Sequence, residues 1–210
     1  MASIKIATLN INGITSPTRI ARLDALLRLQ ETDILLVQEV TYHFLNDFQG
    51  YTTQYNIGAN RRVTAIVARD GINLENTIMS PSARAMAAKF REVWIINLYA
   101  PSGTAMKQQR ERFFNCELPF LLTGEMGHIL LGGNFNCLLE ASDTTGGFTY
   151  GRALAELVHG LALTELGRAT TNAKFTPTIP RPEQSGLTEY SHTRTAPEET
   201  GCGGHCSTVY

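Results

Sequence analysis

Short apolar runs and amphipathic stretches alternate along most of the chain, and this pattern predicts both strands and helices. Residues 4–11 are rich in β-branched side chains that partly alternate with polar ones, which predicts a strand that ends at Asn12-Gly13. Residues 34–37 form a continuous apolar run, typical of a strand covered on both faces. Further strands are predicted over residues 63–68, 85–90, 93–99 and 129–131, the middle two as a hairpin.

Three amphipathic stretches predict helices. The first follows Ser16-Pro17, a good N-cap with proline at the first helical position, and its apolar face carries Ile20, Leu23, Leu26 and Leu27. The others span residues 105–122, where Pro119 disturbs the end, and about 151–163. Because strands and helices alternate without a regular βαβ order, the pattern favours an α/β or α+β fold with mixed sheets.

The pattern changes in the C-terminal part of the chain. Four of the eight prolines lie beyond residue 170, and no apolar periodicity continues past Tyr190. We therefore expect one domain over residues 1–192 and a divergent, disordered tail over residues 193–210.

Composition supports a single folded domain. Of the 210 residues, 43% are hydrophobic and 18% are charged, which is enough apolar material for one packed core. The net charge is only −1, but residues 58–112 hold nine basic and four acidic side chains, and residues 113–210 hold five basic and ten acidic ones. The basic middle predicts a surface that faces phosphates, although the same charges could also be scattered over a solvated face.

Nothing in the sequence predicts a membrane or secreted protein. No apolar run approaches the ~20 residues of a membrane span, and the N-terminus lacks a signal peptide. Four cysteines are too few for a disulfide scaffold in a chain of this length. We expect an intracellular protein with no membrane partner.

Polar side chains stand at the ends of four predicted strands. Side chains at strand ends share one rim of a sheet, where ligand sites of α/β proteins form. Each could instead have a structural role, as a turn cap, a solvated acid or a core aromatic. The residues concerned are Asn10, Glu39, Tyr99, Asn134 and Asn136.

Taken in order, the four motifs resemble those of the endonuclease/exonuclease/phosphatase superfamily. The motifs are residues 7–13 (Ala-Thr-Leu-Asn-Ile-Asn-Gly), 36–39 (Leu-Val-Gln-Glu), 97–102 (Asn-Leu-Tyr-Ala-Pro-Ser) and 132–137 (Gly-Gly-Asn-Phe-Asn-Cys). The sequences of these motifs are most similar to those of the apurinic-endonuclease-like branch. Within that branch they most resemble the endonuclease domain of LINE-type (non-LTR) retrotransposons. The resemblance covers about residues 3–170. It implies an α/β fold in which two mixed β-sheets pack as a sandwich with helices outside, in four layers.

The resemblance also implies a chemistry. The family hydrolyses phosphodiester bonds with Mg²⁺ or Mn²⁺, and Glu39 matches its metal-binding glutamate while Asn10 matches the asparagine beside the metal. A carboxylate suits Mg²⁺, a hard cation. Tyr99 and Asn136 match residues that contact the attacked phosphate. As candidate contacts to the DNA backbone we name Arg61, Arg62 and Arg110.

Two departures from the family pattern predict a weak or inactive enzyme. Asn134 stands where the family has an aspartate that orients or deprotonates the attacking water, and an amide cannot accept a proton at neutral pH. Losing a positioned base costs about 10²–10⁴ in rate. The family also closes with a Ser-Arg-Ile-Asp-Arg-like strand, and no such segment follows residues 187–193. The C-terminal strand is therefore predicted to be missing, through truncation or a shifted reading frame.

The function that the resemblance implies is nicking of duplex DNA, with DNA as partner and a nuclear working place. Any reverse transcriptase would lie on a fused or separate chain. Two alternatives stay open, which are a catalytically inactive remnant that binds nucleic acid and a phosphatase of the same superfamily that acts on a small phosphoester.

Overall fold

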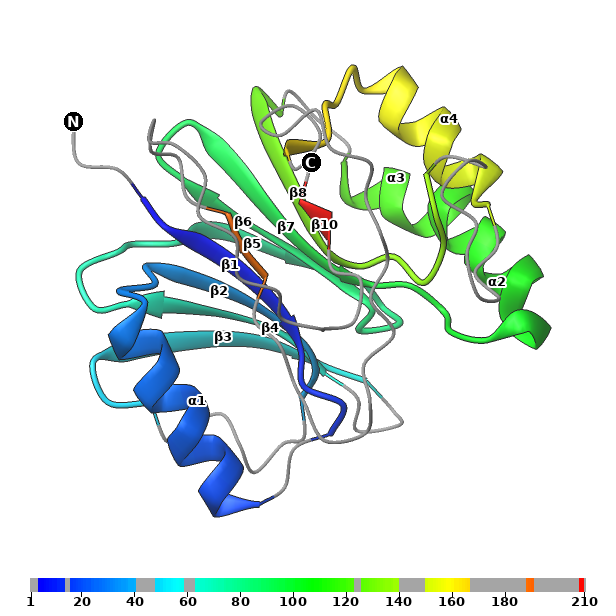
Figure 1. The fold of residues 1–210 in the computed structure, drawn as a ribbon. Helices are drawn as coiled ribbons and strands as arrows, with labels where there is room; N and C mark the ends of the chain where they lie inside the picture. The colour runs from blue at the N-terminus through cyan, green and yellow to red at the C-terminus, as the bar shows by residue number, and fades with distance from the viewer. Residues whose placement is uncertain are drawn as a thin grey trace, which may run out of the picture.

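The computed structural model describes residues 4–13, 16–40, 48–58, 63–122, 126–139, 150–166, 188–190 and 208–209. Within them, two mixed sheets pack face to face (Figure 1). The strands of the first sheet, in spatial order, are β3 (Tyr51–Ile57), β4 (Val63–Arg69), β2 (Ile34–Val40), β1 (Ile6–Asn10) and β9 (Thr188–Tyr190). Those of the second are β10 (Thr208–Val209), β8 (His128–Asn134), β7 (Val93–Tyr99), β6 (Ala85–Phe90) and β5 (Glu75–Met79). The pairs β1/β2 and β7/β8 are parallel, and the other pairs are antiparallel.

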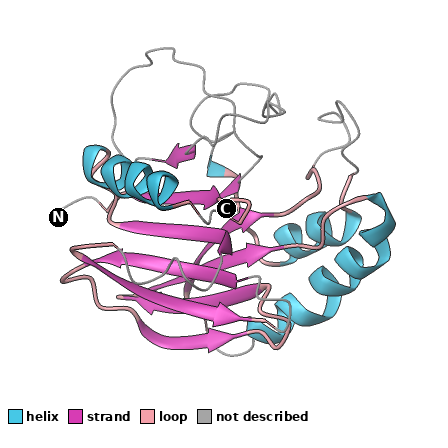
Figure 2. Ribbon diagram, turned by 90° about the horizontal axis from the view of Figure 1, so that it is seen from below, coloured by secondary structure: helices cyan, strands magenta, loops and turns pink. Residues whose placement is uncertain are grey.

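Helices lie on the outer sides of the two sheets (Figure 2). Helix α1 (Pro17–Leu29) packs on the first sheet, as its apolar face predicts. The predicted helix over residues 105–122 is confirmed as a broken helix on the second sheet, joined there by α4 (Arg152–Gly160). Its pieces are η2 (Thr104–Met106), α2 (Lys107–Arg112), the π-helical η3 (Phe113–Glu117) and α3 (Leu118–Leu121). Pro119 opens α3, because proline fits only the first turn of a helix.

Three apolar clusters hold the four layers together. One lies between the sheets, a second joins the first sheet to α1, and the third joins the second sheet to the broken helix and α4. Strand β2 contributes to two of them, since Ile34 and Leu36 face the other sheet while Leu35 and Val37 face α1. These four side chains are 0% exposed, which confirms the prediction of a strand covered on both faces. The predicted four-layer sandwich is thus confirmed.

Short strands from the C-terminal part border both sheets. β9 pairs with Ile6, Ala7 and Thr8 of β1, and β10 pairs with Gly132 and Gly133 of β8. These two short strands contribute three paired residues to one sheet and two to the other, and the absence of the family's C-terminal strand stays a prediction. The predicted tail over residues 193–210 lies outside the described residues except for β10, so the domain boundary at residue 192 stays a prediction.

Four strands of the described part of the chain were not predicted from the sequence, namely β3, β5, β9 and β10. β3 and β5 carry several exposed or half-buried polar side chains, and each forms one edge of its sheet. Among the helices of the described part of the chain, none is long and apolar enough to cross a membrane.

Candidate active site

Four of the strands end at the same rim of the sandwich. The amino-terminal halves of these strands contribute Ile6, Ile34, Val93 and Leu130 to the cluster between the sheets. Further along, the side chain of Gln38 on β2 is bonded to that of Asn97 on β7. The strands therefore run in the same direction, and their carboxyl ends lie together (Figure 1). This arrangement brings the carboxyl ends of β1, β2, β7 and β8 to one rim.

Glu39 is held at a break in the β2–β4 pairing. The register shifts between Gln38 and Val40, and Glu39 has a φ of 57°, in the left-handed region that side chains other than glycine rarely adopt. Its carboxylate Oε1 accepts a hydrogen bond of 3.0 Å from Asn10 Nδ2. A bulge of this kind re-aims a side chain, and here it presents an acid at the rim.

Asn10 orients Glu39, and the hydrogen bonds of Asn10 permit only one orientation of its side-chain amide. Its Oδ1 accepts the backbone N–H of Asn12 at 2.9 Å, and a backbone N–H can only donate. The amide nitrogen must therefore face Glu39. Because the side-chain oxygen of Asn10 is used in this local turn, Asn10 positions the carboxylate, while its own oxygen is directed at the backbone.

A buried polar bridge links the two sheets directly behind the rim. Gln38 Nε2 donates to Thr8 Oγ1 and, over 2.7 Å, to Asn97 Oδ1. Asn97 Nδ2 in turn donates to the carbonyls of Val37 and Ala65 in the first sheet at 2.8 and 2.7 Å. Gln38 and Asn97 are 0% exposed, so the bridge fixes the sheets relative to each other next to Glu39 and Tyr99. Both residues lie in the motifs named above, but no role for either side chain could be predicted from the sequence.

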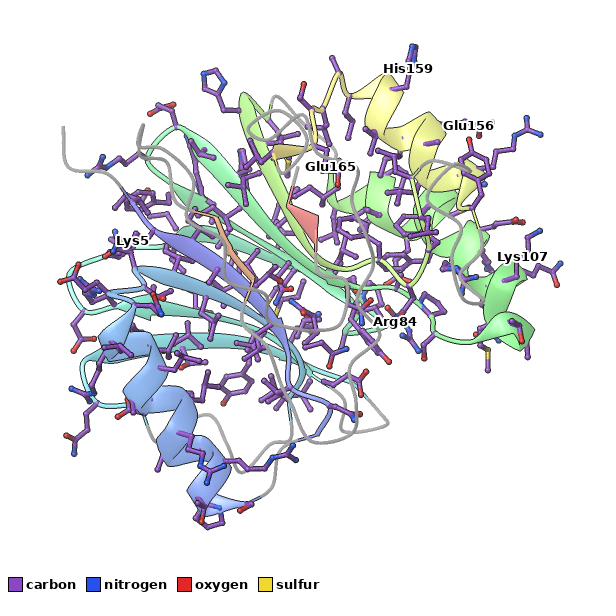
Figure 3. All side chains as sticks on the ribbon, viewed as in Figure 1. Lys5, Arg84, Lys107, Glu156, His159 and Glu165 are labelled. Carbon is purple, nitrogen blue, oxygen red and sulfur yellow. The ribbon has the colours of Figure 1, made fainter. Side chains whose placement is uncertain are left out.

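Tyr99 is buried at the end of β7 and is paired with an arginine that the sequence analysis did not single out. The guanidinium of Arg84 lies 5.3 Å from the centre of the Tyr99 ring, and its Nη1 donates to the Tyr99 carbonyl over 3.3 Å. The Tyr99 hydroxyl lies 3.3 Å from Ser102 Oγ. Arg84 is half-buried and lies at the rim where the strands end (Figure 3). Its positive charge therefore lies directly beside Tyr99.

Asn134 and Asn136 form a turn that is tied to the segment after Tyr99. Asn134 Oδ1 accepts the backbone N–H of Asn136 at 3.1 Å, and Asn136 Nδ2 donates to the carbonyl of Ala100 at 2.7 Å. Asn134 lies opposite Tyr99 in the β7/β8 register. The approach is so close that a Cβ on Gly133 would lie 2.1 Å from the Leu98 carbonyl oxygen. Only glycine fits there, which explains the glycine that precedes Asn134.

The three predicted DNA contacts have different outcomes. Arg61 and Arg62 lie outside the described residues. Arg110 is only 5% exposed, and its Nη1 donates to the carbonyls of Pro101 and Gly103 at 2.8 and 3.2 Å. The sequence-based role of Arg110 is therefore corrected. This side chain holds the loop after Tyr99 from inside the protein and is not displayed to a DNA backbone.

The donor set at the rim fits a hard cation that is held by few protein ligands. In the described part of the chain, no three His, Cys, Asp or Glu side chains gather into a metal cluster. Glu39 uses one carboxylate oxygen for Asn10, which leaves the other for a ligand. Mg²⁺ often keeps several waters and binds through one or two carboxylates together with substrate phosphate. The residues at the rim fit that mode and not a closed cage of protein ligands.

Among the residues that the structure describes, the resolved pKa shifts lie on the outer helices α1 and α4. A side-chain hydrogen bond from Arg28 to Asp24 on α1 raises the pKa of Arg28, and a bond from Arg152 to Glu156 on α4 does the same for Arg152. Figure 3 shows Glu156 and His159 on α4, well away from Arg84 at the rim.

Comparison with known proteins identifies the fold. No protein-family model matches the sequence, and no curated protein does. Among solved structures, an AP endonuclease from Archaeoglobus fulgidus is 21% identical, with 87% of this chain and 80% of that chain covered and a TM-score of 0.68. A 3′–5′ exonuclease from Neisseria meningitidis is 20% identical, with 86% and 80% covered and a TM-score of 0.71.

A sugar phosphatase has a similar fold. A mannosyl-6-phosphatase from Bacteroides thetaiotaomicron is 15% identical, with 78% of this chain and 73% of that chain covered and a TM-score of 0.59. The chain thus has the fold of the endonuclease/exonuclease/phosphatase type, as its motifs predict. At these identities the likeness concerns the fold alone and does not separate the branches of that type.

Proposed function

We propose that the protein binds DNA and hydrolyses its phosphodiester bonds with Mg²⁺ or Mn²⁺, as a nicking endonuclease of the retrotransposon type. The observation that carries this proposal is the Asn10–Glu39 hydrogen bond at the same rim as Tyr99, Asn134 and Asn136. An oriented carboxylate beside neutral amides suits a site that must hold a cation and a phosphate together. The neighbours' names support the choice of DNA, and the Neisseria protein is also described bound to a product DNA hairpin.

Each residue has a distinct part in the proposed site. Glu39 would hold the cation through its carboxylate, and Asn10 fixes the direction of that carboxylate. When bound, a divalent cation neutralises the phosphate and polarises it for attack. Arg84 supplies a positive charge beside Tyr99, and its contact with the Tyr99 ring keeps both groups in place.

Asn134 limits the rate of the proposed reaction. Its Oδ1 accepts the N–H of Asn136, and an aspartate carboxylate could accept the same hydrogen bond. The amide differs in having no second acceptor oxygen and no basicity, so an attacking water loses its proton acceptor. We propose that the enzyme is slow for this reason, and that the short pairing of β9 and β10 adds to the defect.

Two further candidate functions each rest on one observation. Asn134 favours a remnant that binds DNA without cutting it. The likeness to the mannosyl-6-phosphatase favours a phosphatase for a small phosphoester. A nuclear working place, and a reverse transcriptase on the same or a separate chain, belong to the retrotransposon part of the proposal.

Nicking of supercoiled plasmid tests the proposed function. With Mg²⁺ or Mn²⁺, the protein should convert supercoiled to open-circular DNA slowly, and Glu39→Gln or EDTA should abolish the conversion. Glu92→Gln changes a carboxylate whose side chain is 87% exposed, in the turn between β6 and β7, and serves as the matched control. Nicking that survives Glu39→Gln would contradict the proposed site. Hydrolysis of sugar phosphates without nicking would favour the phosphatase.

A further inference from the structure

We propose that strand β3 pairs with the β3 strand of a second copy of this chain, so that the first sheets of the two copies form one continuous sheet. Among the described residues, β3 has a neighbouring strand on one side only, where it pairs with β4 (Figure 1). Its other side is an edge, and an edge strand presents backbone N–H and C=O groups with which a further strand can pair. The proposal concerns how two copies associate and is independent of the proposed function.

The backbone groups at this edge belong to every second residue of β3. The Asp70 N–H donates to the Gly50 carbonyl at 2.9 Å, which directs the backbone groups of Gly50 toward β4. Arg69 lies opposite Tyr51 and donates its own N–H away from β3, to the Asp33 carbonyl at 2.8 Å. Because successive residues of an antiparallel strand direct these groups to opposite sides, the odd-numbered residues of β3 direct theirs away from β4. These residues are Tyr51, Thr53, Tyr55 and Ile57.

β3 lacks the features by which edge strands usually avoid pairing. Its seven residues include no charged residue and no proline, and its register with β4 continues through all of them without a bulge. The edge strand β5 of the second sheet differs in these respects. Its register with β6 shifts between Glu75 and Ile78, Asn76 has a φ of 51°, and Glu75 is an exposed acid. Of these two edges, β3 is therefore the one open to a further strand.

The sequence of β3 complements itself, which favours a second copy as the partner. When two β3 strands pair antiparallel about a two-fold axis at Gln54, Tyr51 lies opposite Ile57 of the second copy, and Thr53 lies opposite Tyr55. All the outward backbone groups are then paired. Each opposed pair joins an aromatic and a β-branched side chain, a combination that stabilises antiparallel strands, and no like charges meet. Tyr55 and Ile57, which are 37% and 44% exposed in one copy, lie in this interface.

The symmetry of this pairing leaves both rims open. β3 runs parallel to β2, because both are antiparallel to β4, and its carboxyl end therefore points to the rim. A two-fold axis reverses the second copy, so the two rims lie at opposite ends of the joined sheet. An interface made mainly by one pair of strands is small, and we expect the dimer to dissociate on dilution.

Hydrogen exchange measured by NMR at several protein concentrations, together with sedimentation equilibrium, tests the proposal. The protein should change from monomer to dimer between about 10 µM and about 1 mM, the range expected of a small interface. The backbone amides that point away from β4 should exchange at least about 10-fold more slowly at the highest concentration. Those that point toward β4 should change little. The two sets are the odd-numbered and the even-numbered residues of β3.

A charge at the centre of the edge should prevent dimer formation. Tyr55→Lys should raise the Kd of the dimer at least about 10-fold, because it removes the pairs with Thr53 and brings two lysines to diagonal positions across the axis. Met106→Lys makes the same kind of change at a side chain that is 40% exposed on η2, beside the second sheet, and should dimerise like the unaltered protein. Thermal denaturation checks that both variants fold, and the exchange pattern of the unaltered protein tests the pairing without any variant.

Three results would overturn the proposal. They are a protein that stays monomeric up to about 1 mM, a dimer in which the outward amides of β3 exchange as fast as in the monomer, and equal weakening by Tyr55→Lys and Met106→Lys. Protection of the outward amides only after addition of an unrelated extended peptide would assign the edge to a different partner, and would equally contradict pairing with a second copy.

Discussion

Asn10 Nδ2 donates a hydrogen bond of 3.0 Å to Glu39 Oε1, and so joins the ends of two neighbouring parallel strands through their side chains. The bond determines where the carboxylate points, because the backbone of Glu39 is in a strained left-handed conformation and the oxygen of Asn10 is held by Asn12. The protein itself therefore orients the Glu39 carboxylate. A cation that is held by few protein ligands requires such an orientation.

Removing the Asn10 amide should weaken cation binding more than it weakens the fold. We expect Asn10→Ala to raise the Kd for Mn²⁺ about 10- to 100-fold, since groups that orient a metal ligand have effects of this size. Titration followed by electron paramagnetic resonance of free Mn²⁺ measures it. Asn73 donates to Glu75 in an equivalent pair on the exposed surface, so Asn73→Ala is the control. An unchanged Kd for Asn10→Ala would show that Glu39 needs no such support.

The bridge between the sheets should be important for stability. Asn97→Ala removes two donors from the carbonyls of Val37 and Ala65 and the acceptor of Gln38, all in the buried interior. Leaving such groups unsatisfied should lower the free energy of unfolding by about 3 kcal/mol. Urea denaturation measures it, with the exposed Asn115→Ala as comparison. A loss as small as that of Asn115→Ala would mean that the bridge is not maintained in solution.

Replacing Gly133 by alanine should destabilise the protein, whereas the same change at Gly160 should not. At Gly133 the new Cβ would lie 2.1 Å from the Leu98 carbonyl oxygen at a φ of +138°, so a loss of about 3 kcal/mol or more is expected. Gly160 ends α4 with nothing within 4 Å of an added Cβ. Alanine there should be neutral or stabilise by up to about 1 kcal/mol. Thermal denaturation compares the two variants, and similar melting temperatures would refute the close packing of β8 on β7.

Arg110 should stabilise the loop after Tyr99 and should not contact DNA phosphates. Arg110→Lys keeps the charge but removes the geometry that reaches the carbonyls of Pro101 and Gly103. We expect a lower melting temperature and slower nicking, with an unchanged slope of log Kd against log salt. A reduced slope would restore Arg110 as a contact to DNA phosphates.

The central strands could be predicted from the sequence because a short continuous apolar run is typical of a strand that is buried on both faces. Residues 34–37 and 93–99 are examples, and both form inner strands of their sheets. The edge strands β3 and β5 escaped because their faces are largely exposed or polar, which weakens the period of two. Motif order placed Asn10, Glu39, Tyr99 and Asn134 at one rim, since strand ends share a position in any fold with this topology.

Contacts between the two sheets were beyond the reach of sequence patterns. The Gln38–Asn97 bond joins residues 59 positions apart and depends on how the sheets pack. Arg84 stood among nine basic residues of the middle segment, and nothing local distinguishes it from the others. Arg110 was named as a DNA contact because it belongs to the basic middle segment of the sequence. In the structure its side chain is buried, and the loop carbonyls of Pro101 and Gly103 compensate that burial.

The rate of plasmid nicking by Asn134→Asp tests the central claim most directly. An aspartate keeps the hydrogen bond to the N–H of Asn136 and adds a proton acceptor at the rim, next to the site of Glu39 and Asn10. The variant should nick supercoiled DNA about 10²-fold or more faster than the unaltered protein in Mg²⁺. The gain should vanish in the Asn134→Asp/Glu39→Gln double variant. A rate that Asn134→Asp leaves unchanged, or a gain that persists without Glu39, would contradict the account.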